Sequence, residues 1–392
     1  MRFTINNTNL YKEKKMSRKM NLLKKLLAGA VCVSMIGAMV GCGTTAETGT
    51  STGNNTNTTS AESEGASSYS KSDASLVFKV GSTFNEGSIL CDSLEHMCQL
   101  IEEKTNGDIQ FERYYGGTLY TLPEEFSYLQ QGAVDLASPM QGIASQVMPL
   151  WQIGANGNTA SKGVDIFNYI ANEDEKTSPL LQEEATAAGV HPFGYNIGDY
   201  NVVVCRSEAS TMEDLKGRAF GIPAQGAAVY EAMGLNVVTC ETADAYESLS
   251  RGVVDCFAAG ISSVSSMKLY ETAKSCLVLS ATGGTGICMM NEASWEKLSE
   301  EQQKIFTEAY NETISWMKDR YDNELLPAYE KEISDACTLT YLEGDELEKL
   351  IDVKTETTIS QYQQAAEIVG VSDDYELVQN TAKEYAEKLN AE

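Results

Sequence analysis

The chain has 392 residues, which is enough for two domains of ordinary size, each with its own core. Its 56 acidic residues outnumber its 29 basic residues, so the formal net charge is −27. Such an acidic protein repels nucleic acid and anionic lipid, and we expect neither as a binding partner. The net charge does not define a small ligand, because a local pocket can oppose the global field.

Residues 1–41 have the pattern of an export signal, in which a basic head precedes an apolar run. The run covers about 15 residues, too few for a membrane span of roughly 20. It ends in Met39-Val40-Gly41-Cys42, which resembles the lipobox of bacterial lipoproteins. We therefore expect an exported protein, lipid-anchored through Cys42 on the extracytoplasmic face of the cell membrane. The alternative is an ordinary signal peptide in which Cys42 is incidental.

Residues 42–75 are rich in Gly, Ser, Thr, Asn and Ala and contain one aromatic residue, Tyr69. A segment of this composition cannot bury a core, so we predict a disordered tether. The lipid anchor, the tether and the folded body together describe a domain held near a membrane but free to turn.

The folded body is predicted to begin at residue 76 with strands that alternate with helices. Apolar residues at helical spacing mark the helix at 88–104, and Gly116-Gly117 separates the second strand from the next helix. Residues 138–160 are expected to form loops and short helices. The remaining elements of this part are strands at 76–80, 109–115, 134–137, 190–195 and 201–205 and a helix at 123–131.

The stretch from Met212 to Val264 is the one around which the rest is organised. It predicts strands at 218–222, 236–240 and 255–259 and helices at 224–233 and 242–251. Strands that alternate with helices indicate a parallel sheet covered on both faces, and ligands bind beyond the carboxyl ends of such strands. The strand ends carry no nucleophile, base or metal cluster, which favours a binding crevice over a reaction site.

Two segments echo each other, residues 125–135 and residues 245–255. Each is an amphipathic helix, a Gly able to end it in the left-handed conformation, and then Val-Asp and a strand. Helix-Gly-strand units are common, so coincidence is the alternative. The echo favours two similar lobes that present the same strand end to a shared cleft.

The chain is expected to end with strands at 276–280 and 286–290, a helix over about 300–336, a strand at 339–342 and two helices. Ser299 and Gln302 form a capping box at the start of the long helix, and Pro327 should kink it. A helix of this length spans roughly 50 Å, more than one domain, so we expect it to lie across both lobes.

No residue pattern indicates an enzyme. The two histidines, His96 and His191, lie in no catalytic motif, and both are expected to be structural. The cysteines after Cys42 form no CxxC pair and are interpreted mainly as small buried apolar residues. We therefore expect no catalytic residue, no metal site and no cofactor.

Several short stretches together resemble the solute-binding proteins of tripartite ATP-independent periplasmic (TRAP) transporters, the DctP-like family. They are Gly116 to Leu119, Gln131 to Asp135, Met212 to Gly217, Gly252 to Asp255 and Asn291 to Gln303. The resemblance implies an α/β, two-lobed periplasmic-binding-protein-like (Venus flytrap) fold. Lobe I would cover 76–198 and 284–300, and lobe II 199–283. Residues 301–392 would hold the spanning helix and a part that packs mainly on lobe II.

The resemblance also implies an activity. The protein would capture a small organic solute between its lobes and deliver it to the membrane subunits of a TRAP transporter. In the family, an Arg two positions before the Pro of the first lobe II strand clamps the ligand carboxylate, and here that position is Gly221. A second Arg is often found at the lobe crossing, where this chain has Tyr200. An Asn-Pro after the Val-Asp strand is replaced by Ala259-Gly260.

These departures lead us to expect a solute that is not an ordinary carboxylate held by Arg. The aromatic and amide candidates in the cleft suggest an apolar, aromatic or neutral polar solute, although each aromatic could equally be core. Arg218 could restore the clamp only if the alignment slipped. The candidate ligand-binding residues are Phe84, Asn85, Gln141, Trp151, Tyr195, Tyr200, Gly221, Gln225, Phe257 and Ala259. A lipid-anchored sensory or surface-interaction domain with the same fold is the competing function.

Overall fold

The computed structural model describes residues 74–153, 160–282 and 285–391. The predicted export signal, the predicted lipidation site Cys42 and the predicted tether up to residue 73 lie outside these ranges. None of the helices in the described ranges is both long and apolar enough to cross a lipid bilayer.

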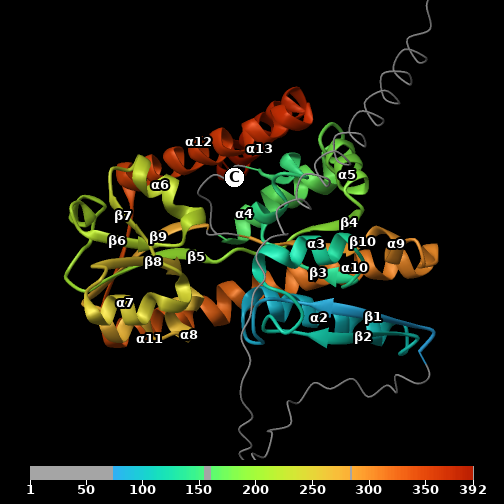
Figure 1. The fold of residues 1–392 in the computed structure, drawn as a ribbon, viewed down its shortest axis with the longest axis horizontal. Helices are drawn as coiled ribbons and strands as arrows, with labels where there is room; N and C mark the ends of the chain where they lie inside the picture. The colour runs from blue at the N-terminus through green and yellow to red at the C-terminus, as the bar shows by residue number, and fades with distance from the viewer. Residues whose placement is uncertain (1–73, 154–159, 283–284, 392) are drawn as a thin grey trace, which may run out of the picture. The chain divides into compact units, whose positions relative to one another are not determined.

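The first sheet has five strands in the order β2-β1-β3-β10-β4 (Figure 1). β1 is parallel to β2 and to β3, whereas β10 is antiparallel to both of its neighbours, β3 and β4. β4 therefore runs in the same direction as β1, and the carboxyl ends of β1, β3 and β4 share one edge of the sheet. The strands are β1 (Leu76–Gly81), β2 (Ile109–Tyr114), β3 (Leu136–Ala137), β4 (Val190–Tyr195) and β10 (Ile287–Asn291).

The second sheet has six strands in the order β11-β9-β5-β8-β6-β7. β6 is parallel to β7 and β8, as the alternation of strands and helices predicts. β5, however, is antiparallel to β8 and β9, so the sheet as a whole is mixed. The strands are β5 (Tyr200–Cys205), β6 (Ala219–Ile222), β7 (Asn236–Thr239), β8 (Cys256–Gly260), β9 (Ser275–Thr282) and β11 (Thr338–Tyr341). Below, lobe I is the part built on the first sheet and lobe II the part built on the second.

Helices cover both faces of the second sheet. One core cluster joins the sheet to α6 and α12 through Tyr230 and Leu350, and another joins it to α7, α8 and α11 through Leu249, Val264 and Ile333. The α-helices within the described residues are α2 (Ile89–Lys104), α3 (Glu125–Gln130), α4 (Ala160–Asn168), α5 (Ser178–Ala187), α6 (Ala227–Ala232), α7 (Ala245–Arg251), α8 (Ile261–Ser266), α9 (Glu292–Trp295), α10 (Glu300–Arg320), α11 (Leu326–Ala336), α12 (Gly344–Val369) and α13 (Ser372–Ala391).

The predicted long helix is present as α10, a wide π turn η11 (Tyr321–Leu325) and α11. Its capping box forms as expected, because the backbone N–H of Gln302 donates to the Ser299 hydroxyl and that of Ser299 to the Gln302 side chain. Pro327 cannot donate a backbone hydrogen bond, and the irregular turn ends at Leu325, two residues before it. α10 packs on α2 of lobe I and α11 on α8 of lobe II, so the helix spans both lobes.

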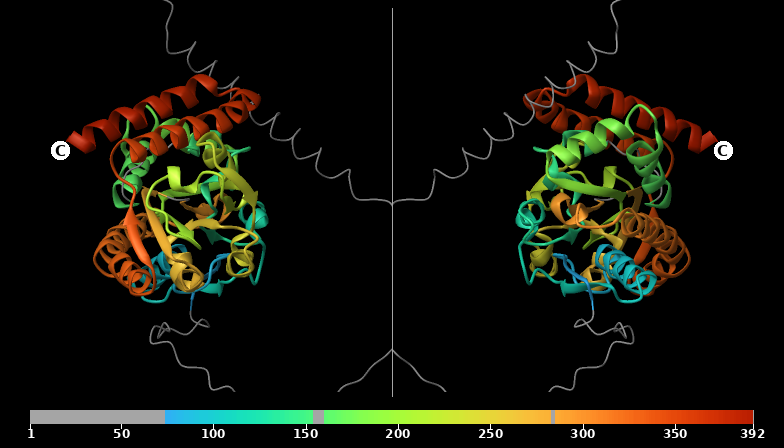
Figure 2. Two further views of the ribbon diagram at one scale, coloured as in Figure 1. Left: turned by 90° about the vertical axis from the view of Figure 1, so that its left-hand side faces the viewer. Right: turned by 90° about the vertical axis from the view of Figure 1, so that its right-hand side faces the viewer.

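The C-terminal helices differ from the expectation that they pack mainly on lobe II. α12 begins on the core of lobe II at Leu350 but ends on that of lobe I at Ala366. α13 packs on lobe I, because Tyr375 and Val378 are buried in its core. Figure 2 shows these red helices beside the green segment that contains α4, which α13 contacts.

The internal echo corresponds to the same local structure in both lobes. Gly132 and Gly252 follow their helices with φ of 69° and 73°, the left-handed conformation that Gly adopts without strain. The carboxylate of Asp135 accepts the backbone N–H of Lys79 at 2.7 Å, and that of Asp255 accepts the N–H of Ala219 at 3.0 Å. Each Asp thus ties the turn to the neighbouring parallel strand.

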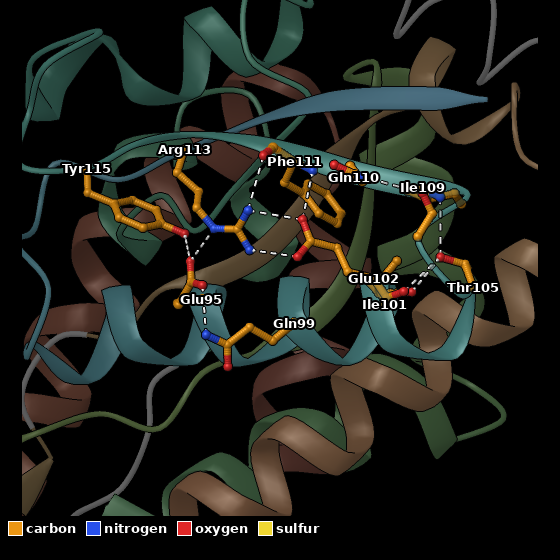
Figure 3. A network of polar contacts seen from close by, with 11 residues as sticks. Glu95, Gln99, Ile101, Glu102, Thr105, Ile109, Gln110, Phe111, Arg113 and Tyr115 are labelled. Atoms are coloured by element: carbon orange, nitrogen blue, oxygen red, sulfur yellow. Dashed lines mark hydrogen bonds and ion pairs between the residues drawn. The ribbon is translucent and has the colours of Figure 1, made fainter. Parts of the chain in front are cut away.

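A polar network fixes the edge strand β2 to α2 (Figure 3). The Arg113 guanidinium donates to both carboxylate oxygens of Glu102, at 3.0 and 3.1 Å, and to Glu95 at 2.7 Å. The Tyr115 hydroxyl also donates to Glu95, and the backbone N–H of Phe111 donates to Glu102. Every charged group in this network has a partner of opposite charge, so its role is structural.

Candidate interlobe binding site

The chain crosses from β4 of the first sheet to β5 of the second. This crossing connects one edge of each sheet. β4 ends at Tyr195, on the lobe I edge that holds the carboxyl ends of its parallel strands. β5 begins at Tyr200, and its next residue, Asn201, pairs with Gly260 at the carboxyl end of β8. The crossing therefore joins the two strand edges at which ligands bind in α/β folds.

Asp199 organises this crossing. Its carboxylate accepts four hydrogen bonds, from the backbone N–H groups of Tyr200 and Ser262, the Ser262 hydroxyl and the Tyr321 hydroxyl, at 2.6–2.9 Å. Burial raises the pKa of Asp199, and these donors oppose the rise. A Cβ at Gly260 would lie 2.4 Å from the Asp199 carboxylate, so only Gly fits at that strand end. Asp199 thus joins the crossing to α8 and to the spanning helix.

On lobe I, Phe84 and Asn85 lie in the loop after β1, as the sequence predicts. Phe84 is partly exposed and Asn85 is exposed. The Tyr120 ring packs against Gly81 at the end of β1, and its hydroxyl donates to Glu125 at 3.4 Å. Burial raises the pKa of Glu125 to about 8, so this acid is largely neutral at pH 7.

Three of the predicted residues lie together but bond within lobe I. They are Gln141, Trp151 and Tyr195. The Gln141 amide donates to the carbonyls of Trp151 and Ile153, and the Tyr195 hydroxyl donates to the Trp151 carbonyl at 2.6 Å. The Trp151 indole N–H donates to the Leu181 carbonyl at 2.9 Å. Trp151 and Tyr195 are fully buried in lobe I, so they are core residues in this structure and would contact a ligand only after a rearrangement.

Gly221 and Phe257 are register partners on β6 and β8. A Cβ at Gly221 would lie 2.8 Å from the Phe257 ring and 3.1 Å from a Val254 methyl group. Phe257 is fully buried. The core side chains of Phe257 and Val254 therefore occupy the space that the first atoms of a longer side chain at position 221 would need.

The other predicted residues on lobe II lie at the edge of its sheet that the crossing enters. They are Tyr200, Ala259 and Gln225. Tyr200 is partly buried, and its ring meets that of Tyr321 edge-on at 6.2 Å. Ala259 is partly buried near the end of β8. Gln225 lies in the short turn η8 (Ala224–Gly226), which follows β6.

Arg218 does not reach this edge. Its guanidinium donates to the carbonyls of Ser207 and Glu208 at 3.2 and 2.8 Å. Those residues follow the carboxyl end of β5, which is antiparallel to β8 and therefore ends at the opposite edge of the sheet. A slipped alignment cannot make Arg218 the missing clamp.

α12 and α6 line a groove that the sequence analysis did not predict. The groove, open and of about 530 Å³, separates the two helices and is lined by Ala224, Ala228, Ala232, Glu356, Thr357, Ser360 and Gln361. Lys354 lies on α12 between the residues that pack on lobe II and those that pack on lobe I, and burial lowers its pKa to about 8. In the sequence these polar residues of α12 look like the ordinary polar face of an amphipathic helix, so no signal marked them.

The histidines are structural, as predicted. His96 stacks on Trp316 and His191 on Trp295, with ring centroids 3.9 and 3.8 Å apart, and burial lowers the pKa of His191 to about 4. No group of three His, Cys, Asp or Glu side chains within the described ranges could hold a metal ion.

Comparison with known proteins gives a consistent result. The family model of bacterial extracellular solute-binding protein family 7, DctP, matches residues 80–364. The chain is 24% identical over 259 residues to the C4-dicarboxylate-binding protein DctB of Bacillus subtilis. The aligned region covers 62% of this chain and 69% of DctB.

Solved structures share the fold. A TRAP periplasmic solute-binding protein from Ochrobactrum anthropi, with its C-terminus bound in its ligand-binding pocket, has a TM-score of 0.67 at 19% identity. The match covers 80% of this chain and 97% of that protein. Another from Sulfitobacter, with bound β-D-galacturonate, has a TM-score of 0.61 at 19% identity and covers 75% of this chain and 98% of that one.

The family match spans well over half of the chain, and the two mixed sheets joined at a crossing are the fold of these proteins. The family consists of extracytoplasmic binding proteins rather than enzymes. This chain therefore belongs to the DctP family and is a solute-binding protein of the TRAP type.

Proposed function

We propose that this protein is a lipid-anchored extracytoplasmic receptor that captures a small organic solute between its lobes and delivers it to TRAP membrane subunits. The observation that carries the proposal is the convergence of both strand edges at the crossing held by Asp199, in a chain of this family. The lipid anchor rests on the lipobox-like segment that ends at Cys42.

The solute is proposed to be apolar, aromatic or neutral and polar, rather than a simple carboxylate held by Arg. DctB is named for C4-dicarboxylates and the Sulfitobacter protein holds galacturonate, both of which carry carboxylates. Here Phe257 and Val254 crowd the Cβ direction of Gly221, and Arg218 is bound at the opposite edge. Hydrogen bonds to charged groups contribute roughly 1.5–3 kcal/mol each, so losing the clamp lowers carboxylate affinity about 10- to 100-fold.

Native mass spectrometry of the purified protein should detect a co-purified solute, and calorimetry with a panel of solutes should rank the classes. We expect neutral and aromatic solutes to bind more tightly than succinate or malate. Replacing Arg218 by Ala should not change any affinity, because that side chain is remote from the crossing. Tight binding of a simple dicarboxylate that is lost in Arg218→Ala would disprove the proposed solute class.

A reconstructed clamp provides the converse test. Gly221→Arg combined with Phe257→Ala supplies the cation and the space for its first methylene groups. We expect this double variant to gain at least tenfold in dicarboxylate affinity over the unmodified chain. Gly221→Arg alone is the matched control, and it should lose stability because the Phe257 ring remains in place.

The anchor is tested separately by Cys42→Ser. The unmodified protein should fractionate with membranes and carry a lipid at Cys42 by mass spectrometry. The variant should not. Membrane association that persists without Cys42 would contradict the anchor but not the solute-binding function.

A further inference from the structure

Cys205 and Cys256 are direct neighbours across the second sheet. Cys205 is the last residue of β5, Cys256 is the first residue of β8, and the antiparallel register places them opposite each other. Both side chains are fully buried in the same core cluster, so they lie on one face of the sheet. The Cys205 thiol donates to the Val203 carbonyl at 3.9 Å.

The backbone pattern brings these side chains close together. The N–H of Arg206 donates to the Asp255 carbonyl at 2.9 Å, so the adjacent pair formed by Cys205 and Cys256 is not hydrogen-bonded. Consistent with this, the Cys205 carbonyl accepts instead from Lys274 next to β9. In such pairs the opposing Cα atoms are about 4.5 Å apart, within the range of about 4.4–6.8 Å that disulfides use.

The folded surroundings make Cys256 the more easily ionised of the two thiols. The adjacent Cys205 thiol and the nearby Arg218 guanidinium lower the pKa of the Cys256 thiol. This gives Arg218, which does not reach the ligand edge, a different role. By contrast, the neighbouring buried Cys276 has Val204 and Leu339 as its register partners and faces no cysteine directly.

We propose that Cys205 and Cys256 form a cross-strand disulfide as the chain folds in the presence of a low-molecular-weight disulfide outside the cytoplasm. The Cys256 thiolate attacks one sulfur of that reagent and releases one thiol. The Cys205 thiolate then attacks the mixed disulfide, which forms the Cys205–Cys256 bond and releases a second thiol. The protein loses two hydrogens, and the external disulfide is reduced to two thiols.

The disulfide would hold the two strands that frame the crossing. β5 starts at Tyr200 and β8 ends at Gly260, so a covalent bond at their far ends fixes their register. It would also close a loop of about 50 residues in the unfolded chain, which lowers the entropy of that state. Disulfides form and persist in oxidising environments outside the cytoplasm, and the DctP family is extracytoplasmic.

The test begins with the reduced full chain, unfolded and refolded in a glutathione redox buffer so that burial does not limit access. Free thiols are then alkylated and the digest is mapped by mass spectrometry. We expect the peptides that contain Cys205 and Cys256 to be joined, with a rise in Tm of roughly 5 °C or more. Full alkylation of both residues, or linkage of either to another cysteine, would overturn the proposal.

Two variants define the result. Cys276→Ser should leave the Cys205–Cys256 link intact. Cys205→Ala should abolish the link, leave Cys256 alkylated and remove the difference in Tm between oxidised and reduced protein. The mapping of the unmodified chain decides the question even if Cys205→Ala does not fold.

Discussion

Glu125 shows how one residue can make the stability of this protein depend on pH. It begins α3, is buried and accepts a hydrogen bond from the Tyr120 hydroxyl, and burial raises its pKa from 4.5 to about 8. Below pH 4.5 the acid is protonated in both the folded and the unfolded chain. As pH rises from 4.5 to 8 only the unfolded chain ionises, so the free energy of unfolding falls and then levels off above pH 8.

We expect Glu125→Gln to remove this dependence. Each unit of pKa shift corresponds to about 1.4 kcal/mol, so the variant should gain on the order of 4 kcal/mol over the unmodified chain at pH 8 and little at pH 4.5. Denaturant unfolding at both pH values measures the effect. Glu247→Gln, at an exposed helix position, is the control. Equal shifts at both pH values would contradict the assigned ionisation.

Residue-scale expectations from the sequence held where they depended on local chemistry. Gly132 and Gly252 end helices because only Gly adopts their conformation easily, and the adjacent Asp residues form the same bonds in both lobes. Trp151 could not be placed by such reasoning. Whether an aromatic side chain faces a cleft or a core depends on partners distant in sequence, here the Leu181 carbonyl and the Tyr195 hydroxyl.

At the scale of elements, the edge strand β2 depends on one ionic network. Glu102 has a side chain only 3% exposed, and it is bound by both terminal nitrogens of Arg113. Breaking such a pair from one side leaves an uncompensated buried charge, which costs roughly 3–5 kcal/mol.

We therefore expect Arg113→Met to lower the free energy of unfolding by roughly that amount. Arg113→Lys should be intermediate, because it keeps the charge but loses the bidentate geometry. Arg251→Met, which breaks an exposed pair with Glu247, should cost less than about 1 kcal/mol. Similar losses in Arg113→Met and Arg251→Met would show that the network of Figure 3 does not stabilise the strand.

The sequence predicted which helices and strands exist better than it predicted what each of them packs against or pairs with. Hydrophobic spacing and the Ser299 capping box located α2 and α10 because those signals lie within the helices themselves. The packing of α13 on lobe I was not foreseen, since its apolar face could cover either lobe. The mixed sheet was missed for a similar reason, because nothing in the residues of β5 indicates that it runs antiparallel to β8 and β9.

For the whole molecule, the crossing and the spanning helix are two of the connections between the lobes, and α12 is another. Tyr321 is the residue that joins the crossing to the spanning helix: its hydroxyl donates to Asp199 at 2.8 Å and accepts the backbone N–H of Tyr200 at 3.1 Å. It lies in the π turn between α10, which packs on lobe I, and α11, which packs on lobe II. The ring is fully buried, so Tyr321→Phe removes the hydroxyl without changing the packing.

We expect Tyr321→Phe to lower the free energy of unfolding by about 1 kcal/mol and to speed amide hydrogen exchange at residues 198–202. Asp199 keeps its bonds to Ser262, so exchange within α8 should change less. Tyr246→Phe, which removes a bond to Glu271 at the surface, is the matched control and should leave exchange at the crossing unchanged. If exchange at 198–202 were equally slow in both variants, Tyr321 would only fill space, and the coupling between crossing and helix would rest on packing alone.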